Sequence, residues 1–461
     1  MVTRPGAARR VIVVGGGIAG IAAAVRLADA GVRVTILETR KKLGGRATSF
    51  DDARTGQRLD NCQHIVMGCC TNFLDLLNRL GVSGKIAWSR SIWWIEPGGR
   101  RSVMHPGLAP APAHFAGSFL RARFLGAEDK VSIAGAMHRL ARARLVDLED
   151  ETFAEWLARA EQTEPAVERF WAPVVVSACN GWPGRVAASE AAHVFQEGFL
   201  AHRDAARIGV PTTPLVELYD AAAGVIERAG GAVRLGVSVA RLEPSAVETA
   251  SGDRLEADRV ICATPFERAL SIVAQDVQAT DPRFAAMRRL EHSPILGVHL
   301  TFDAPVLDLP HAALVGTGTQ WLFRKDDAGA RVHAVVSAAD PWMSLNEDEI
   351  VGRVVEDVRR CLPGSRGARL VAGRPVKEKR ATFLPTIESV RARPAVSGPS
   401  GVILAADYVR TGWPSTMEGA ARAGYLAAGA ALGLDGSWAL RPSLRPAALY
   451  RAARALAGAD D

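Results

Sequence analysis

The chain has 461 residues, of which 48% are hydrophobic and 23% are charged, and its formal net charge is +7. This composition is typical of a folded protein and excludes a disordered chain, and the length favours two domains over one compact core. The basic residues are scattered and no nucleic-acid-binding motif accompanies them, so we expect no nucleic-acid partner.

The six cysteines are spread along the chain without a CxxC pair, and no group of residues has the spacing of a metal site. Scattered cysteines in a long chain are typical of a reducing compartment, so we expect a cytoplasmic protein that holds no metal. No stretch is long and apolar enough for a transmembrane helix. Any membrane contact is therefore expected to be peripheral, on the inner face of the cell membrane.

The first 38 residues have the pattern of a dinucleotide-binding unit. Residues 10–14 predict a buried strand, and a glycine-rich turn follows at residues 15–20. Residues 21–30 predict a helix, and residues 32–37 predict a second strand that ends in Glu38. A strand, a G-x-G-x-x-G turn, a helix, a strand and an acid in this order indicate a Rossmann-type site.

Each residue of this motif has an expected role. Gly15 permits the tight turn, Gly17 lets the backbone approach a pyrophosphate, and Gly20 lets the helix pack against the strand. The helix N-terminus presents free N–H groups to the phosphates. Glu38 lies eighteen residues after Gly20, where its carboxylate can accept hydrogen bonds from both ribose hydroxyls.

A second glycine motif distinguishes FAD from NAD. Gly44, Gly45 and Arg46 follow Glu38 after a short basic link, and an NAD site does not require them. They resemble the second glycine motif of the flavin amine oxidase and phytoene desaturase superfamily, in which this loop lies on the pyrophosphate and approaches the flavin. The resemblance implies that Arg46 supplies positive charge to the phosphates. The alternative is an ordinary turn with a surface arginine.

Polar residues precede an apolar run in the next segment. Residues 60–64 read Asp-Asn-Cys-Gln-His, and an amphipathic helix is expected at residues 72–80. A buried polar side chain needs a partner, so Gln63 and His64 are expected to be constrained by the fold or by chemistry. For a lone histidine, a structural role is the default.

The middle of the chain predicts a second domain. Residues 105–126 form an amphipathic segment that would lie on lipid or make an ordinary surface helix. Further helices suit a helical cap over an apolar cavity, or simply a helical core. They are expected at residues 130–144, 152–157 and 190–199, and residues 282–389 add strands and a helix at 347–360.

Two later segments are expected to return to the cofactor. The strands at residues 230–242 and 257–265 resemble the superfamily's second contribution to the flavin site, in which Val239 would hold the adenine through its backbone. A buried strand at residues 402–407 ends in Asp407. Thr416, Met417 and Glu418 then open a helix of small residues, whose N-terminus would face the pyrophosphate or the reduced ring.

Nearly the whole chain resembles the hydroxysqualene dehydroxylase family within this superfamily. The resemblance rests on the glycine motifs, the 60–64 loop with Gly68 and Cys69, Phe170, Trp171, Pro173 and Asn180, and the segment 407–419. Cys62 departs from the glycine expected before Gln63, and Cys70 stands where an aromatic residue is more usual. Both departures lie in the loop expected to approach the flavin ring.

The resemblance implies an α/β fold in which a Rossmann-type FAD-binding domain carries an inserted α+β substrate domain, as in flavin amine oxidases. Residues 1–82, 212–275 and 392–435 would form the FAD-binding domain, and residues 83–211 and 276–391 the substrate domain with its helical cap. Residues 436–461 would form a basic C-terminal helix that lies on an anionic membrane or is solvated.

The implied activity is reductive removal of an allylic hydroxyl, which converts hydroxysqualene, a long-chain isoprenoid, into squalene. The hydroxyl would leave as water, and the remaining cation would take hydride from N5 of reduced FAD in a pocket that excludes water. We expect His64 to donate the proton and Gln63 to hydrogen-bond the leaving oxygen. The sequence does not indicate the reductant of the flavin.

Two other readings remain open. A carotenoid-type desaturase or an amine oxidase would share FAD, although an amine oxidase places a lysine near the ring and no such lysine is identifiable from the sequence. An escort protein for prenylated cargo shares the fold and lacks the flavin. The intact glycine turn, Glu38 and Arg46 argue against an escort protein.

Overall fold

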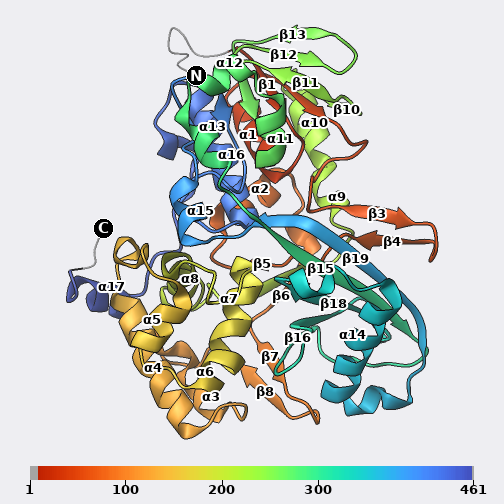
Figure 1. Cartoon of the computed structure of the whole chain (residues 1–461), viewed down its shortest axis with the longest axis vertical. Helices are drawn as coiled ribbons and strands as arrows, with labels where there is room; N and C mark the ends of the chain where they lie inside the picture. Colours follow the sequence, from red (N-terminus) through yellow and green to blue (C-terminus); the bar gives the residue numbers. More distant parts are fainter. Residues whose placement is uncertain (1–8, 459–461) are drawn as a thin grey trace.

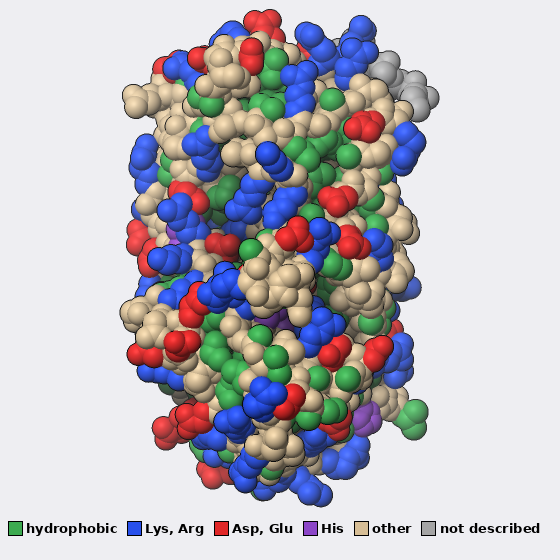
Figure 2. Space-filling view, turned by 90° about the vertical axis from the view of Figure 1, so that its right-hand side faces the viewer, with side chains coloured by type: hydrophobic (Ala, Val, Ile, Leu, Met, Phe, Trp, Pro, Cys, Tyr) green, Lys and Arg blue, Asp and Glu red, His purple; other side chains and the backbone are tan. Residues whose placement is uncertain are grey.

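The structure is a computed structural model that describes residues 9–458. It has an upper lobe built around a parallel sheet and a lower lobe built around a larger sheet with a helical cap at its side (Figure 1). Basic, acidic and hydrophobic side chains are interspersed on the face shown in Figure 2.

The upper lobe contains a five-stranded sheet in which all neighbouring strands are parallel. Its order is β10 (Ala232–Leu235), β2 (Arg33–Glu38), β1 (Arg10–Val14), β14 (Arg259–Cys262) and β20 (Ile403–Leu404). The apolar run of β1 therefore lies at the centre of the sheet, as expected for a strand covered on both faces. The strand expected at 402–407 is shorter than predicted, because only two of its residues pair with β14.

Helices of small residues cover this sheet closely. Helix α1 (Ile18–Asp29) lies beside α16 (Met417–Ala431) (Figure 1). At their crossing a Cβ on Gly424 would lie 2.3 Å from the carbonyl oxygen of Ala19, so glycine is needed for the two backbones to approach. The remaining elements here are α2 (Thr71–Arg79), α9 (Val216–Tyr219), α10 (Ala221–Arg228), α11 (Phe266–Ile272), α12 (Gln275–Ala279), α13 (Pro282–Met287) and α15 (Ile387–Ala392).

A small antiparallel sheet lies at the outer end of the upper lobe (Figure 1). It consists of β11 (Val239–Leu242), β12 (Ala246–Thr249) and β13 (Arg254–Glu256). Two further small sheets follow the glycine motifs in the chain. They are the hairpin of β3 (Ser49–Asp52) and β4 (Gln57–Asp60), and the sheet of β5 (Val66–Met67), β9 (Ile208–Pro211) and β6 (Ile86–Ser89).

The lower lobe contains a seven-stranded sheet. Its order is β19 (Leu370–Phe383), β15 (His292–Phe302), β18 (Arg331–Ser337), β17 (Trp321–Arg324), β16 (His311–Leu314), β7 (Ile92–Ile95) and β8 (Arg101–Met104). Neighbours are antiparallel except β16 and β7, which are parallel. Helix α14 (Glu347–Cys361) buries its apolar side among residues from the sheet.

Aromatic side chains form the core of the helical cap. Phe153 and Trp156 are stacked with their ring centroids 5.5 Å apart, and Trp171 meets Phe195 edge-on at 4.8 Å. Thr152 caps α5 through a capping box with Glu155. The cap helices are α3 (Ala116–Arg121), α4 (Ala127–Arg142), α5 (Phe153–Arg159), α6 (Glu164–Ala166), α7 (Ala172–Cys179) and α8 (Ala188–Phe195).

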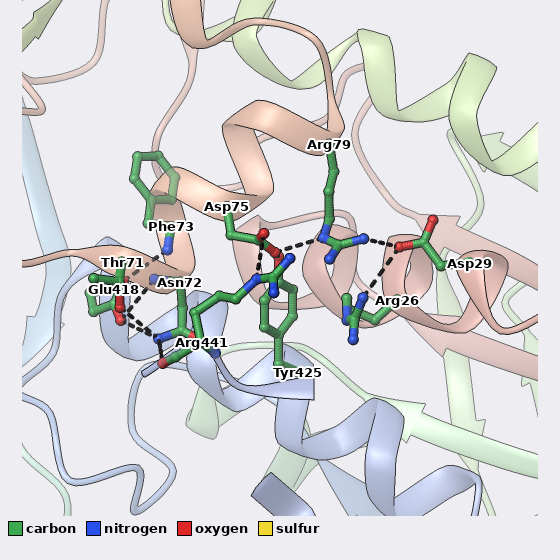
Figure 3. Close-up of polar contacts among 10 residues, drawn as sticks. All are labelled: Arg26, Asp29, Thr71, Asn72, Phe73, Asp75, Arg79, Glu418, Tyr425 and Arg441. Atoms are coloured by element: carbon green, nitrogen blue, oxygen red, sulfur yellow. Dashed lines mark hydrogen bonds and ion pairs between the residues drawn. The ribbon is translucent and has the colours of Figure 1, made fainter. Parts of the chain in front are cut away.

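The C-terminal segment connects both lobes. Arg441 contacts α2, where its Nε donates to the Asp75 carboxylate at 2.7 Å (Figure 3). Helix α17 (Ala448–Ala455) then packs against α4, and Tyr450 is buried in the cap core. Within residues 9–458, none of the helices combines the length and the apolar character needed to cross a bilayer.

Candidate functional site

The first glycine turn has the geometry that a dinucleotide requires. Gly15 has a φ of 109°, and a Cβ there would lie 2.5 Å from the Ala263 carbonyl oxygen. A Cβ on Gly20 would lie 2.0 Å from the carbonyl oxygen of Gly15, so both positions need glycine for the packing of the protein itself. Gly17 differs, because a Cβ there would meet no other atom closer than 3.9 Å. The packing of the protein itself therefore does not require glycine at position 17, and a role of Gly17 toward a ligand stays a prediction.

The N-terminus of α1 is free to bind an anion. Its N-cap, Gly17, offers no side-chain hydrogen bond, and the first turn contains no acid. The N–H of Ile21 donates to the Gly17 carbonyl at 2.9 Å, so the N–H groups before it have no partner within the helix. This end of the helix therefore suits a pyrophosphate.

Glu38 lies at the end of β2, beside the glycine turn. Its two carboxylate oxygens accept from the N–H of Gly16 and the N–H of Arg40, each at 2.7 Å. A carboxylate has about four acceptor positions, so two hydrogen bonds leave room for the ribose hydroxyls. These backbone contacts fix the carboxylate in advance of binding.

The second glycine loop lies directly on the first. The N–H of Gly44 donates to the Gly16 carbonyl at 2.9 Å, and a Cβ on Gly45 would lie 3.0 Å from the Gly17 Cα. Arg40, which the sequence analysis did not assign, donates to the Gly45 carbonyl at 2.9 Å. The two loops predicted to flank the pyrophosphate thus meet in the structure.

Arg46 does not stand free beside these loops. Its guanidinium forms an ion pair with Asp407 and donates to the Ala381 carbonyl at 2.8 Å. Burial disfavours the charge of Arg46, but the Asp407 carboxylate outweighs this effect and raises the Arg46 pKa. Ser415 hydrogen-bonds the other oxygen of Asp407. Arg46 and Asp407, both predicted to contact the cofactor and 361 positions apart, therefore hold each other's side chains in place.

The side chains of Thr416 and Glu418, at the start of α16, have different structural roles. The Thr416 hydroxyl accepts from the Gly419 N–H at 3.1 Å and caps the helix. Glu418 is fully buried, and its side chain reaches the first turn of α2 (Figure 3). Its two oxygens accept from the N–H groups of Asn72 at 3.2 Å and Phe73 at 2.8 Å. A contact of Glu418 with FAD stays a prediction, and it concerns the backbone.

Val239 is buried in β11. Its carbonyl accepts a hydrogen bond from Arg268 at 2.7 Å, a contact that no sequence motif indicates. The role of Val239 toward adenine stays a prediction.

The loop 60–64 is anchored on three sides. The Asp60 carboxylate accepts from the Leu215 N–H at 3.0 Å, and its carbonyl oxygen accepts from His299 Nε2 at 2.8 Å. The side-chain amide of Asn61 donates to the carbonyl of Arg46. The loop is therefore held next to the second glycine motif and against β15.

His64 lies in this loop with one ring nitrogen engaged. Its Nδ1 is 3.1 Å from the Cys62 carbonyl, and because a carbonyl only accepts, Nδ1 carries the hydrogen. Burial lowers the pKa of His64, which favours the neutral ring with a lone pair on Nε2. The side chain borders a narrow apolar gap that has no room for a water molecule. The gap is lined also by Val66, Phe73, Ile86, Pro211, Leu215, Leu218, Tyr219 and Met417.

Gln63 is held by a lysine that the sequence did not identify. Lys325 Nζ donates to Gln63 Oε1 at 3.2 Å and lies 3.4 Å from Asp60 Oδ2. The Gln63 amide nitrogen donates to the His64 carbonyl at 3.2 Å. Because Lys325 is 265 positions from Asp60, only the tertiary structure brings them together.

Among the described residues, no group of three or more metal-ligating side chains is arranged to hold a metal ion.

The fold and this site define a flavoprotein oxidoreductase whose cofactor is FAD. The profile described as "Flavin containing amine oxidoreductase" matches residues 18–432, and the chain belongs to this family. The expected flavin amine oxidase-like fold is confirmed, since a putrescine oxidase variant has a TM-score of 0.70 at 18% identity over 92% of this chain and 99% of its own.

Curated relatives cover nearly the whole chain. A hydroxysqualene dehydroxylase of Sinorhizobium fredii is 28% identical over 92% of this chain and 98% of its own length. The enzyme of the same name from Zymomonas mobilis is 27% identical over 91% and 98%. A 15-cis-phytoene desaturase of Synechococcus elongatus is 22% identical over 96% and 100%.

Proposed function

We propose that the protein removes the hydroxyl group of hydroxysqualene reductively and releases squalene. The observation that carries this proposal is the end-to-end similarity to two hydroxysqualene dehydroxylases. The placement of Gln63 and His64 supports it, since both lie in one loop and His64 is surrounded by apolar side chains. A carotenoid-type desaturase is the alternative, because phytoene desaturases also match nearly the whole chain.

The residues present fit FAD. In this proposal the N-terminus of α1 with Gly15, Gly17 and Gly20 binds the pyrophosphate, and Glu38 binds the ribose. Reduced FAD, when bound, supplies the hydride. The other proposed contacts come from Gly44, Gly45, Arg46, Val239, Asp407, Thr416, Met417 and Glu418.

The chain's own residues would manage the departure of the hydroxyl. Breaking the C–O bond leaves both electrons on oxygen, which must take up a proton to leave as water. His64 Nδ1 is committed to the Cys62 carbonyl, so the proton would be given from Nε2 by the doubly protonated ring. The lowered pKa of His64 makes this form the minor one near neutral pH. Gln63 has a second amide N–H to offer the oxygen. Apolar walls would keep water from the allylic cation.

A long isoprenoid must be drawn from a bilayer, so we also propose peripheral membrane contact. Leu108 and Leu120 in the segment 105–126 are exposed, as is Leu456 beside α17. Each could enter the lipid interface, and Arg121 next to Leu120 would face anionic headgroups. Co-sedimentation with vesicles containing anionic lipid tests this; a protein that stays in the supernatant would contradict it.

Product analysis tests the activity. The FAD-loaded protein is reduced with dithionite and incubated anaerobically with hydroxysqualene, and a parallel sample with oxidised flavin receives phytoene. We expect squalene in the first sample and unchanged phytoene in the second. Desaturated phytoene together with no squalene would overturn the proposal. A His64→Ala variant with full FAD content and full turnover would remove His64 from the mechanism.

A further inference from the structure

Lys325 follows β17 in the seven-stranded sheet and reaches the loop 60–64. Its Nζ lies 3.2 Å from Gln63 Oε1 and 3.4 Å from Asp60 Oδ2, and its side chain is 26% exposed. Asp60 is itself fixed by Ser49 and by the N–H of Leu215. The ammonium group is therefore held in place by a rigid carboxylate on one side and meets the glutamine amide on the other.

The contact with Lys325 fixes the orientation of the Gln63 side-chain amide. An ammonium group only donates hydrogen bonds, so the amide oxygen has to face Lys325. The amide nitrogen is then turned toward His64, whose carbonyl takes one of its two N–H groups at 3.2 Å. The second N–H remains to donate. Without the lysine, the amide could turn over and present its oxygen, which only accepts.

Two other groups near the loop already have partners. Arg46 is paired with Asp407 and with the Ala381 carbonyl. His64 uses its Nδ1–H on the Cys62 carbonyl. Gln63 has an N–H left to direct at a departing oxygen, which makes the orientation of that amide important.

We propose that Lys325 is a positioning residue that orients the Gln63 carboxamide so that an N–H is directed at the departing hydroxyl oxygen. The inference rests on the proposed function and deepens it. In the reaction the C–O bond breaks, and the oxygen takes the proton that the protonated His64 ring gives from Nε2 and leaves as water. The carbon would receive hydride from the reduced flavin. The substrate gains two electrons and the flavin loses two.

A competing explanation is that Lys325 only neutralises buried Asp60. A double-mutant cycle separates the two roles, because residues that act together are not additive. Lys325→Met, Gln63→Leu and the double variant are compared as FAD-loaded, dithionite-reduced enzymes with hydroxysqualene. We expect Lys325→Met to lower kcat roughly 10- to 100-fold, the range for a lost charge-assisted hydrogen bond, with little change in KM. The double variant should be no slower than Gln63→Leu.

Three further variants sharpen the test. Lys325→Arg keeps the charge and the donors, so it should recover much of kcat. Gln63→Glu keeps a partner for Lys325 but has no side-chain N–H, so its kcat should be as low as that of Gln63→Leu. This variant tests the role of the Gln63 N–H even if Lys325→Met loses FAD. Lys377→Met is the matched control, because Lys377 in β19 donates only to the carbonyls of Met343 and Leu345; its kcat should match that of the wild type.

An unchanged kcat in Lys325→Met, or an equal loss on both Gln63 backgrounds, would overturn the inference and leave the proposed function intact. A full rate in Gln63→Glu would overturn it as well. A wild-type enzyme that makes no squalene would overturn the proposed function, and the inference with it.

Discussion

At the residue scale, two glycines of one motif are needed for different reasons. Gly20 packs against Gly15, whereas a Cβ on Gly17 would lie 3.9 Å from its nearest neighbour, the Gly45 Cα. We expect Gly20→Ala to lower the melting temperature of the FAD-free protein, because its Cβ would lie 2.0 Å from a carbonyl oxygen. Gly17→Ala should leave the FAD-free protein within about 1 kcal/mol of wild type and weaken FAD binding tenfold or more, roughly 1.4 kcal/mol.

Thermal unfolding and flavin titration measure the two effects separately. Gly352→Ala is a control, since Gly352 is exposed on α14 and a Cβ there meets no atom within 4 Å. If Gly17→Ala bound FAD with unchanged affinity, the pyrophosphate would not lie where the turn predicts.

At the element scale, Glu418 joins α16 to the N-terminus of α2. Its buried carboxylate accepts from two backbone N–H groups that the helix cannot satisfy itself (Figure 3). Glu418→Ala should therefore lower the free energy of unfolding by about 1–3 kcal/mol, measured by urea denaturation. Glu356→Ala, which removes an exposed carboxylate from α14, should change it by less than about 0.5 kcal/mol. Equal stability of the two variants would show that this contact contributes little.

Helix α17 provides a second test at this scale. Tyr450 is 4% exposed and packs in the cap core, whereas Leu456 just beyond the helix is 82% exposed. We expect Tyr450→Ala to cost about 3 kcal/mol and Leu456→Ala close to nothing in urea denaturation. If α17 were detached from the cap in solution, the two substitutions would have the same small effect.

At the scale of the whole molecule, buried histidines set the response to acid. Burial lowers the pKa of His114 and His311 to about 4 and that of His193 to about 3. In the unfolded chain these groups take up protons near pH 6.5, so the unfolded state binds more protons between about pH 6.5 and 4. Stability should therefore fall as the pH falls through this window, by up to about 1.4 kcal/mol per pH unit for each histidine.

Urea denaturation at several pH values between 7.5 and 4.5 measures this slope. His114→Met should flatten it, because His114 is buried and neither ring nitrogen has a partner among the described residues. The control is His138→Met, which removes an exposed histidine and should leave the slope unchanged. A slope that stays the same in both variants would assign the acid response to other groups.

Local patterns predicted much of the fold. Strand β1 and helices α1, α2 and α14 lie close to where the local pattern placed them, because each is determined by neighbouring residues. The strand expected at 402–407 is cut to two paired residues. Strand length depends on the partner strand, which the local sequence does not contain.

The chain by itself determined the βαβ unit, its glycine turn and the acid that follows, since these need only residues close in sequence. The tertiary structure decided what the predicted site residues contact. It paired Arg46 with Asp407, turned Glu418 toward α2 and placed Lys325 against Gln63. These contacts join segments hundreds of residues apart, and a charged side chain takes whichever partner the fold brings within reach, which no local pattern specifies.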